Sequence, residues 1–415
     1  HIITLNRSCR LDAIDSAVNQ PASMKEITCD IRQLDVDWFL NEYWQKQPLV
    51  IRQALPGFES PLSPEELAGL ACEEDVNSRI VIEKDGEHPW QPIYGPMDDD
   101  VFSSLPATHW TLLVNDVEKH LPEFAGIVDR FRFIPEWRLD DLMISYAPEG
   151  GSVGPHMDLY DVFILQAQGH RRWDISTRPV DEDNQIEGTP LRIQRHFEAE
   201  FSSLLNPGDL IYIPPAVSHH GVATDDCMSY SIGYRAPAHG EMVSDYIAFL
   251  TQDLPPEQVY RDRDLQAQLH ANEITDAAID RVRKIFQHYL DTDNDQLRRW
   301  LGRFVSDPQA DVNHPVELEF DKPEQLLSHM QDERQLLMRN PASRFAFLRN
   351  DENALLYIDR DEHAVSIRFA ESLCDQRVPA VQRLVDTASD SEKQLLLDLF
   401  NSGKLILMDE DVDTL

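Results

Sequence analysis

The sequence predicts a mixed α and β protein in which a central β-rich domain is flanked by helical segments. Two observations predict this class. Between about residues 138 and 235, short apolar runs are separated by Gly, Pro and Asp, which is typical of a β-sandwich or small barrel. On both sides of this stretch, apolar residues recur at helical spacing instead. The short runs are residues 142–144, 162–165, 173–175, 210–213 and 230–232.

The part before the β-rich stretch begins with a helix followed by a strand. Aromatic and apolar residues recur at helical spacing over residues 38–44, and Pro48 precedes the apolar strand 49–51. Residues 63–66 read Ser-Pro-Glu-Glu, the order of a capping box with proline at the first helical position. A second helix is therefore expected to run to residue 71.

The part after the β-rich stretch is helical first and mixed later. An apolar stripe at helical spacing is formed by Ile279, Val282, Phe286 and Tyr289. This stripe either packs on its own domain or forms a dimer face. Beyond Pro308, three strand-like and two helical pieces predict a small α+β domain that fits a winged helix. These pieces are residues 344–348, 355–358 and 364–367, and the segments around Val381 and 395–400.

The chain is long enough for two or three domains, because it has 415 residues. We expect residues 1–23, which precede the first methionine, to be a disordered or added extension. The predicted domains are then a barrel with N-terminal helices over 24–238, a helical region over 239–306 and the α+β domain over 307–415.

The charge balance limits the class of partner. Asp and Glu number 74 against 37 Lys and Arg, so the formal net charge is −37. A chain this acidic repels phosphate and is a poor binder of DNA or anionic membranes, because such binding relies on Lys and Arg. We therefore expect no direct DNA binding, no membrane binding and a basic protein partner. A solvated acidic surface kept for solubility is the alternative explanation.

The cysteines and the hydropathy pattern predict a cytoplasmic protein. The five cysteines are scattered without a CxxC pair, which argues against a disulfide framework and a zinc knuckle. No segment approaches the length of a membrane span, and no secretory signal is present.

Two stretches of the β-rich domain carry groups that bind metals. In the first, Gly150 to Asp158, His156 and Asp158 are two residues apart, so on a strand their side chains point to the same side. In the second, Pro207-Gly208-Asp209 leads into an apolar strand that ends at Pro214, and His219 follows. Two imidazoles and one carboxylate form the facial triad of non-haem Fe(II) oxygenases, and a set without thiolate is a poor match for structural zinc.

The two stretches follow the cupin spacing with informative departures. Many cupins have His-x-His and a later Glu, whereas this chain has Asp158 and no such Glu, which leaves three ligands. The Asn often found after the last histidine is absent, and Ala223 stands near that place. The offset from Pro214 selects His219 over His220, which we expect to be a surface residue or a neighbour of the ligands.

Arg171 is the candidate for binding a cosubstrate. An Fe(II) oxygenase requires a source of electrons, and 2-oxoglutarate supplies them while a buried cation holds its far carboxylate. Strand alternation places Arg171 on the same side as Trp173 and Ile175, which marks the inner face of the barrel. A bidentate contact between arginine and carboxylate would give both strength and geometry. An exposed arginine pair, Arg171 and Arg172, is the alternative.

These motifs together resemble the bacterial ribosomal oxygenases of the JmjC/cupin-4 type. The resemblance extends from about Met24 to the C-terminus and is most specific between Leu139 and Pro237. Its carriers are residues 140–145, 154–163, 171–173, 207–215 and 231–237.

The resemblance implies a double-stranded β-helix, a helical dimerisation region and a C-terminal winged-helix domain. It implies that His156, Asp158 and His219 bind Fe(II) and that Arg171 binds 2-oxoglutarate, with O₂ as the oxidant. In a well-known member a serine stands near Ala147, so Ser231 is a substitute candidate for a cosubstrate contact.

The resemblance also implies a homodimer that hydroxylates a basic ribosomal protein, with an arginine of the sixteenth large-subunit protein as the first expectation. Tyr160 and Asp161 lie next to the triad in sequence and are candidates for the substrate entrance, with Asp161 pairing with a guanidinium. The alternatives are a histidyl hydroxylase, a small-molecule metal-dependent cupin and a non-enzymatic ribosome-associated binding protein. A small-molecule cupin has no use for a cation at Arg171, and a binding protein does not need the complete triad.

Overall fold

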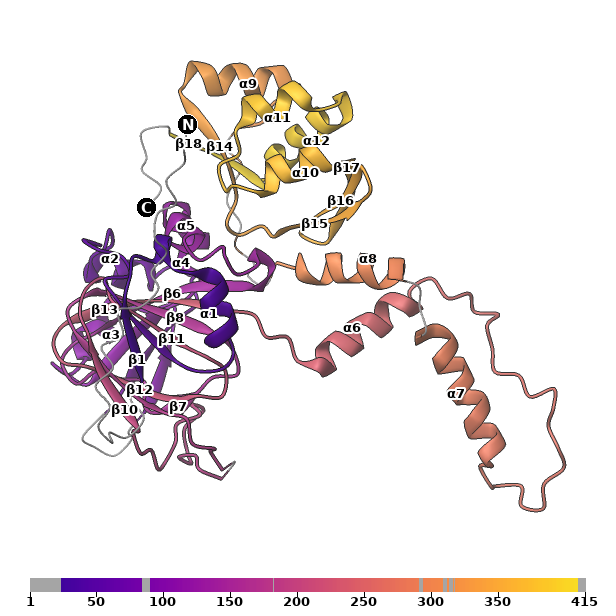
Figure 1. The fold of residues 1–415 in the computed structure, drawn as a ribbon, viewed down its shortest axis with the longest axis horizontal. Coiled ribbons are helices and arrows are strands. Elements are labelled where there is room, and N and C mark those ends of the chain that lie inside the picture. Colours follow the sequence, from indigo (N-terminus) through magenta and orange to yellow (C-terminus); the bar gives the residue numbers. More distant parts are fainter. Residues whose placement is uncertain are drawn as a thin grey trace. The chain divides into compact units, whose positions relative to one another are not determined.

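A computed structural model describes residues 24–83, 90–181, 183–290, 294–308, 312, 316 and 318–409 (Figure 1). The expectation for residues 1–23 lies outside this range. The chain divides into two compact units, which are described separately. The first lies within residues 1–236, 309–342 and 397–415, and the second lies within 237–308 and 343–396. The domain boundaries predicted from the sequence stay predictions.

The strands are β1 (Lys25–Thr28), β2 (Leu49–Arg52), β3 (Ser78–Ile82), β4 (Gln91–Tyr94), β5 (Trp110–Val114), β6 (Leu139–Ala147), β7 (His156–Met157), β8 (Val162–Gln168), β9 (Arg171–Ser176), β10 (Phe201–Leu205), β11 (Leu210–Ile213), β12 (Ser218–Ala223), β13 (Cys227–Tyr234), β14 (Gln335–Arg339), β15 (Phe345–Asn350), β16 (Asn353–Ile358), β17 (Asp361–Ser366) and β18 (Leu405–Asp409). The α-helices are α1 (Val36–Glu42), α2 (Pro64–Leu70), α3 (Asp99–Ser104), α4 (Val117–His120), α5 (Ala125–Asp129), α6 (His239–Thr251), α7 (Asp276–Leu290), α8 (Asn294–Val305), α9 (Pro323–Asp332), α10 (Ile367–Cys374), α11 (Val381–Thr387) and α12 (Asp390–Asn401). Three 3₁₀-helices are η1 (Ile31–Gln33), η2 (Pro122–Phe124) and η3 (Glu136–Arg138).

Two sheets of the first unit enclose its β-rich core. The large sheet has the order β1-β2-β11-β8-β13-β6-β5-β3-β4, and the small sheet has the order β10-β9-β12-β7. Apolar side chains of β8 and β11, such as Ile164 and Ile211, pack against Trp173 and Ile175 of β9. The predicted barrel-like β domain is confirmed, with the two sheets as its opposite walls.

Helices cover the outer face of the large sheet, which explains why its strands are apolar on both sides. Phe39 of α1 and Leu67 of α2 belong to the same buried cluster as Phe163 of β8 and Tyr212 of β11. The predicted capping box is present. The Ser63 hydroxyl accepts from the Glu66 backbone N–H, and the Glu66 carboxylate accepts from the Ser63 backbone N–H.

The turn before β11 is held by a buried carboxylate. Gly208 has a φ of +88°, a conformation that other residues rarely adopt. Asp209 beside it is 1% exposed and accepts hydrogen bonds from the Gln53 and Asn206 backbone N–H groups at 3.0 and 3.1 Å. It also accepts from Arg52 Nη1 at 2.7 Å and from Asn206 Nδ2 at 3.2 Å. The turn is thereby fastened to the end of β2.

Replacing Asp209 with Asn should lower the free energy of unfolding by about 2 kcal/mol, since charged hydrogen bonds are lost in a buried place. Burial alone would raise the pKa of Asp209, but the bonds from Gln53, Arg52 and Asn206 outweigh it and lower the pKa. The charged form therefore adds stability above the unfolded pKa near 4, and this contribution disappears as the pH falls through the lowered folded pKa. Thermal unfolding of D209N and wild type, with the exposed-site variant D226N as control, should show a difference at pH 7 that narrows below about pH 4. An equal difference at both pH values would contradict this account.

The second unit contains most of the predicted α+β pieces. The strands expected at 344–348, 355–358 and 364–367 correspond to β15, β16 and β17, which form one antiparallel sheet. The helical pieces around Val381 and 395–400 correspond to α11 and α12. Trp300 of α8 packs on Tyr246 of α6 and donates to Asp245 Oδ1 at 2.7 Å.

The apolar stripe predicted over residues 279–289 lies on α7. Ile279, Val282 and Phe286 are 46%, 39% and 61% exposed. Among the described residues, the stripe is therefore exposed and does not pack on its own domain. Among the helices described, none is both long and apolar enough to cross a membrane.

Candidate metal centre and pocket

The small sheet brings the two predicted histidine ligands face to face. His156 on β7 is the register partner of His219 on β12. Gly154 enters β7 with a φ of +80°, and a Cβ there would lie 2.8 Å from Ile193 Cγ2. A glycine is thus required where the chain turns toward the first ligand. Asp158 follows β7 directly, so the three side chains meet at one end of the small sheet.

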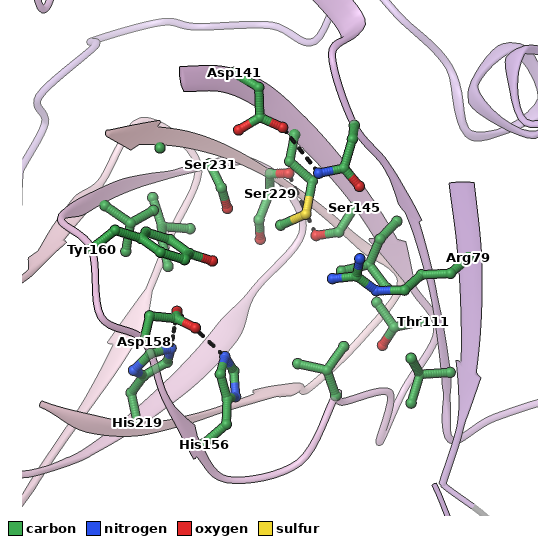
Figure 2. A pocket seen from close by; sticks show the side chains of 18 of the residues that line it. Arg79, Thr111, Asp141, Ser145, His156, Asp158, Tyr160, His219, Ser229 and Ser231 are labelled. Carbon is green, nitrogen blue, oxygen red and sulfur yellow. Dashed lines mark hydrogen bonds and ion pairs between the residues drawn. The ribbon is translucent and has the colours of Figure 1, made fainter. Parts of the chain in front are cut away.

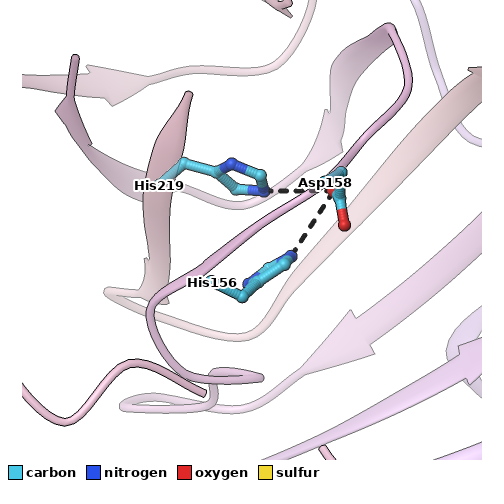
Figure 3. A group of neighbouring side chains, drawn as sticks. All are labelled: His156, Asp158 and His219. Carbon is cyan, nitrogen blue, oxygen red and sulfur yellow. Dashed lines mark ion pairs between the residues drawn. The ribbon is translucent and has the colours of Figure 1, made fainter. Parts of the chain in front are cut away.

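The three side chains form a compact donor set (Figure 3). The Nε2 atoms of His156 and His219 lie 3.6 and 3.5 Å from Asp158 Oδ2. Their Nδ1 atoms lie 2.9 and 3.0 Å from the Gly154 and Val217 carbonyl oxygens. Each Nδ1–H therefore donates to the backbone, which leaves the Nε2 lone pair directed at the site. The ligand atoms of these three residues all lie within 4.8 Å of one another. Among the described residues, this is the cluster whose side chains are close enough to hold one metal ion.

Two of the three triad groups have pKa values that favour metal binding at neutral pH, whereas burial would lower the pKa of His156 but its contacts with Asp158 raise it, so a metal ion has to displace a proton there. Burial lowers the pKa of His219 to about 4, so this ring is neutral. Burial would raise the pKa of Asp158, but contacts with His156, His219 and the Tyr160 hydroxyl lower it to about 2. A charged carboxylate beside a neutral imidazole is the protonation state that a divalent cation requires. The residues present therefore fit an Fe(II)-type ion with nitrogen and oxygen ligands.

A cavity of about 690 Å³ opens beside the triad and is lined by both sheets (Figure 2). The small sheet supplies the two histidines and Arg171, and the large sheet supplies polar residues of β3, β5, β6 and β13. This size is in the range of small-molecule and side-chain binding sites.

Arg171 lines this cavity as strand alternation predicts. Its side chain is buried, with long contacts of 3.5 Å from Nη1 to Ser145 Oγ and 3.4 Å from Nη2 to the Gly151 carbonyl. The Nε atom has no partner among the described residues. Burial lowers the pKa of this guanidinium. A buried cation with spare donors is a ready site for a carboxylate, and its role as the cosubstrate contact stays a prediction.

Ser231 also lines the cavity and is 8% exposed, but it is not among the hydrogen-bond partners of Arg171. Ala147 is fully buried in a small apolar cluster with Ala223 and Cys227. Ala223 is the register partner of Arg171. The hydroxyl that this guanidinium contacts is that of Ser145, which the sequence reasoning did not select.

Tyr160 and Asp161 have different surroundings although they are adjacent in sequence. Tyr160 lines the cavity and is 43% exposed. Asp161 is fully buried away from the cavity, where it accepts from the Tyr212 hydroxyl at 2.6 Å and from Gln45 Nε2 at 2.8 Å. We correct the expectation that Asp161 pairs with a substrate guanidinium, because its carboxylate is taken up by Tyr212 and Gln45 and does not line the cavity.

His220 points away from the triad because it follows His219 on β12, where neighbouring side chains alternate between the two faces. Its ring lies against Phe197, with the ring centroids 6.0 Å apart, and burial lowers its pKa to about 4. It is a neighbour of the site and not a ligand in the described donor set.

The sequence reasoning missed an acidic group on the large sheet. Asp141 of β6 lines the cavity, and Figure 2 shows its carboxylate across the cavity from the triad. Its Oδ2 accepts from Asn115 Nδ2 at 2.9 Å. Burial raises the pKa of Asp141 to about 6. The available signal was the alternation of Asp141, Met143 and Ser145 along β6, which places all three on the cavity side.

Family comparisons match both halves of the chain. A family described as the JmjC domain matches residues 126–242, and one described as the ROXA-like winged helix matches residues 287–405. The ribosomal protein uL16 3-hydroxylase of Escherichia coli is 36% identical over 283 residues, which cover 68% of this chain and 74% of that protein.

Solved structures of E. coli YcfD have the same fold. One matches with a TM-score of 0.80 and 31% identity, covering 90% of this chain and 98% of that one. Another, a ribosomal oxygenase complex with cobalt and 2-oxoglutarate, matches with a TM-score of 0.76 and 32% identity over the same shares. The predicted combination of a JmjC-type barrel and a winged helix is thereby confirmed.

Proposed function

Because the chain belongs to the bacterial ribosomal oxygenases of the JmjC family, we propose that it is a 2-oxoglutarate-dependent hydroxylase of ribosomal protein uL16, acting on an arginine. The observation that carries the proposal is the facial triad beside the buried, incompletely bonded Arg171. A small-molecule cupin does not require that cation, and a binding protein does not require the triad.

Different residues of the cavity have different roles in the proposed reaction. His156, Asp158 and His219 would hold Fe(II), which with 2-oxoglutarate and O₂ supplies the oxidation of an unactivated carbon. Arg171 binds the far carboxylate of the cosubstrate and so fixes its orientation. Ser231 stays a candidate for a further cosubstrate contact, and Tyr160 for a contact with the substrate.

The choice of arginine is supported by Asp141. A substrate arginine that presents its aliphatic carbons to the metal carries its guanidinium several bonds further into the cavity. Asp141 offers a carboxylate at a distance from the triad, on the opposite wall. A neutral histidine side chain would gain little from this charge. The E. coli relative is named a 3-hydroxylase, and carbon 3 of an amino acid is Cβ, so we propose Cβ as the reacting carbon.

Replacing Asp141 with Asn should raise the KM for a uL16 peptide about tenfold or more, because a charge-assisted hydrogen bond is lost. Burial raises the pKa of Asp141 to about 6, so the wild-type carboxylate becomes neutral as the pH falls through 6 and the peptide KM should rise there. The variant should lack this pH dependence. Steady-state kinetics between pH 5.5 and 8, with D226N as control, test both points. An unchanged KM would remove Asp141 from the guanidinium site.

The direct test of the function is mass spectrometry of uL16 incubated with the protein, Fe(II) and 2-oxoglutarate. We expect a gain of one oxygen on an arginine, with fragmentation placing it at Cβ. Oxygen on a histidine would favour the histidyl hydroxylase alternative. Unmodified uL16 together with a modified different ribosomal protein would refute the substrate assignment.

We also propose a homodimer formed through α7 and a cytoplasmic location. The exposed stripe of Ile279, Val282 and Phe286 lies within the predicted helical dimerisation region, and a second copy would cover it. Sedimentation of I279D/F286D should give half the mass of wild type.

The cytoplasmic location is supported by the ribosomal substrate of the E. coli relative. The acidic composition of this chain also favours a basic protein partner over DNA.

A further inference from the structure

The cavity extends beyond the triad onto a wall built by β3 and β5. In the large sheet β3 pairs with β5 and β5 pairs with β6, with Arg79 opposite Leu113 and Leu113 opposite Ser145. Thr111 and Asn115 lie two residues from Leu113 on either side, so their side chains share its face. All of these residues line the cavity, and Figure 2 shows Arg79 and Thr111 on its wall.

This wall carries polar atoms whose hydrogen-bonding capacity is not used. The Arg79 side chain makes no hydrogen bond or ion pair with another described residue. Thr111 is fully buried, and its hydroxyl has no partner among the described residues. Asn115 donates from its amide group to Asp141, while its Oδ1 has no partner in the same part of the chain. Such atoms are costly in a folded protein, and half of the eight found in the described part line this cavity: those of Thr111, Asn115, Arg171 and Trp173. A wall of this kind is typical of a site for a polar ligand.

The proposed reaction limits what that ligand is. If Cβ of the target residue faces the metal, its Cα and both adjoining peptide groups lie within a few bonds of the metal, inside the cavity. A peptide group removed from water needs partners for its N–H and its C=O. Arg79 offers only donors, Asn115 Oδ1 offers an acceptor, and the Thr111 hydroxyl offers both. These are the two kinds of partner that a main-chain segment requires.

Electrostatics exclude a basic side chain from the same wall. Arg79 would repel a guanidinium, which has Asp141 as its partner instead. Arg79 lines the same cavity as the triad and so lies within reach of a peptide bound there.

We propose that Arg79, with Thr111 and Asn115, binds the main chain of the peptide beside the hydroxylated residue, with Arg79 donating to a peptide carbonyl. This inference rests on the proposed function and adds a specificity-determining surface for an extended peptide segment. The two arginines then have different ligands: Arg171 binds the cosubstrate, and Arg79 binds the substrate peptide.

The test measures peptide binding without turnover. Anisotropy of a fluorescein-labelled uL16 peptide is followed with the full chain loaded with Fe(II) and 2-oxoglutarate under argon. R79A should bind the peptide about tenfold more weakly than wild type, and R79K should fall between them, because lysine keeps the charge but loses the planar fork. R172A, which changes an exposed arginine of β9 paired with Asp174, is the matched control and should bind as wild type.

Two further measurements make the assignment specific. The Kd for 2-oxoglutarate, measured by calorimetry without peptide, should be the same in R79A and wild type. A peptide with an ester in place of the amide that follows the target residue presents a weaker carbonyl acceptor, so wild type should lose affinity for it. R79A should lose less, since its interaction with the carbonyl is already absent and only the penalty for the missing N–H remains.

Three results would overturn the inference. They are wild-type peptide affinity in R79A, a weakened 2-oxoglutarate Kd with unchanged peptide affinity, and an equal ester penalty in both proteins. The second result would assign Arg79 to the cosubstrate. Failure of the wild type to bind the uL16 peptide at all would overturn the proposed function itself and is seen before any variant is compared. Circular dichroism and melting of R79A and R79K establish that the variants fold.

Discussion

Asp158→Ala should abolish hydroxylation, with activity falling by more than about a hundredfold, because the only carboxylate of the described triad is lost. The remaining two imidazoles hold a divalent ion weakly and do not balance its charge. Loss of metal should therefore accompany loss of activity. Calorimetric titration with Mn(II) measures the first, and mass spectrometry of uL16 the second.

The folded state must be checked separately in this variant. Asp158 contacts both histidines, and its pKa is lowered to about 2 in spite of burial, so its charge also stabilises the protein without metal. Asp158→Asn keeps the shape of the side chain and serves as the matched variant. It should melt below wild type but above Asp158→Ala, because it loses the charge and keeps the packing, and it should still fail to bind Mn(II) tightly. Full activity with normal metal affinity in either variant would show that Asp158 is not a ligand.

The parts of the site that follow from local sequence were predictable. His156 and Asp158 are two residues apart, and His219 stands at a fixed offset from Pro214, so the chelate needs no knowledge of the rest of the chain. Strand alternation was sufficient to turn Arg171 inward. Asp161 was selected for its nearness to the triad in sequence, which was misleading, because its carboxylate is buried with Tyr212 and does not line the cavity.

The parts that depend on long-range strand pairing were not predictable. Arg79 reaches the cavity because β3 and β5 join the edge of β6, a pairing that no short motif announces. Asp141 belongs to the stretch 140–145 that carries the family resemblance. Its place beside Asn115 in the cavity, however, is visible only in the structure. The apolar stripe on α7 is equally clear in sequence, but only the structure separates packing within the chain from an exposed face.

Arg171→Met should have opposite effects on stability and on cosubstrate binding. The guanidinium is buried with two long hydrogen bonds and one unpaired nitrogen, so the protein without cosubstrate bears an incompletely compensated charge. Replacing such a charge with an apolar side chain of similar length is often neutral or stabilising. We therefore expect R171M to melt at or above the temperature of wild type.

The same substitution removes the partner of the cosubstrate carboxylate, and the KM for 2-oxoglutarate should rise roughly a hundredfold, as expected for a lost bidentate ion pair. Arg172→Met on the outer face of β9 is the control and should change neither quantity. Adding 2-oxoglutarate should raise the melting temperature of metal-loaded wild type and R172M but not that of R171M, because only a bound ligand stabilises the folded state. A general packing defect would lower the melting temperature in the absence of 2-oxoglutarate as well. An unchanged KM would transfer the role of cosubstrate cation to Arg79 or Arg192, the two other arginines that line the cavity without an ion-pair partner among the described residues.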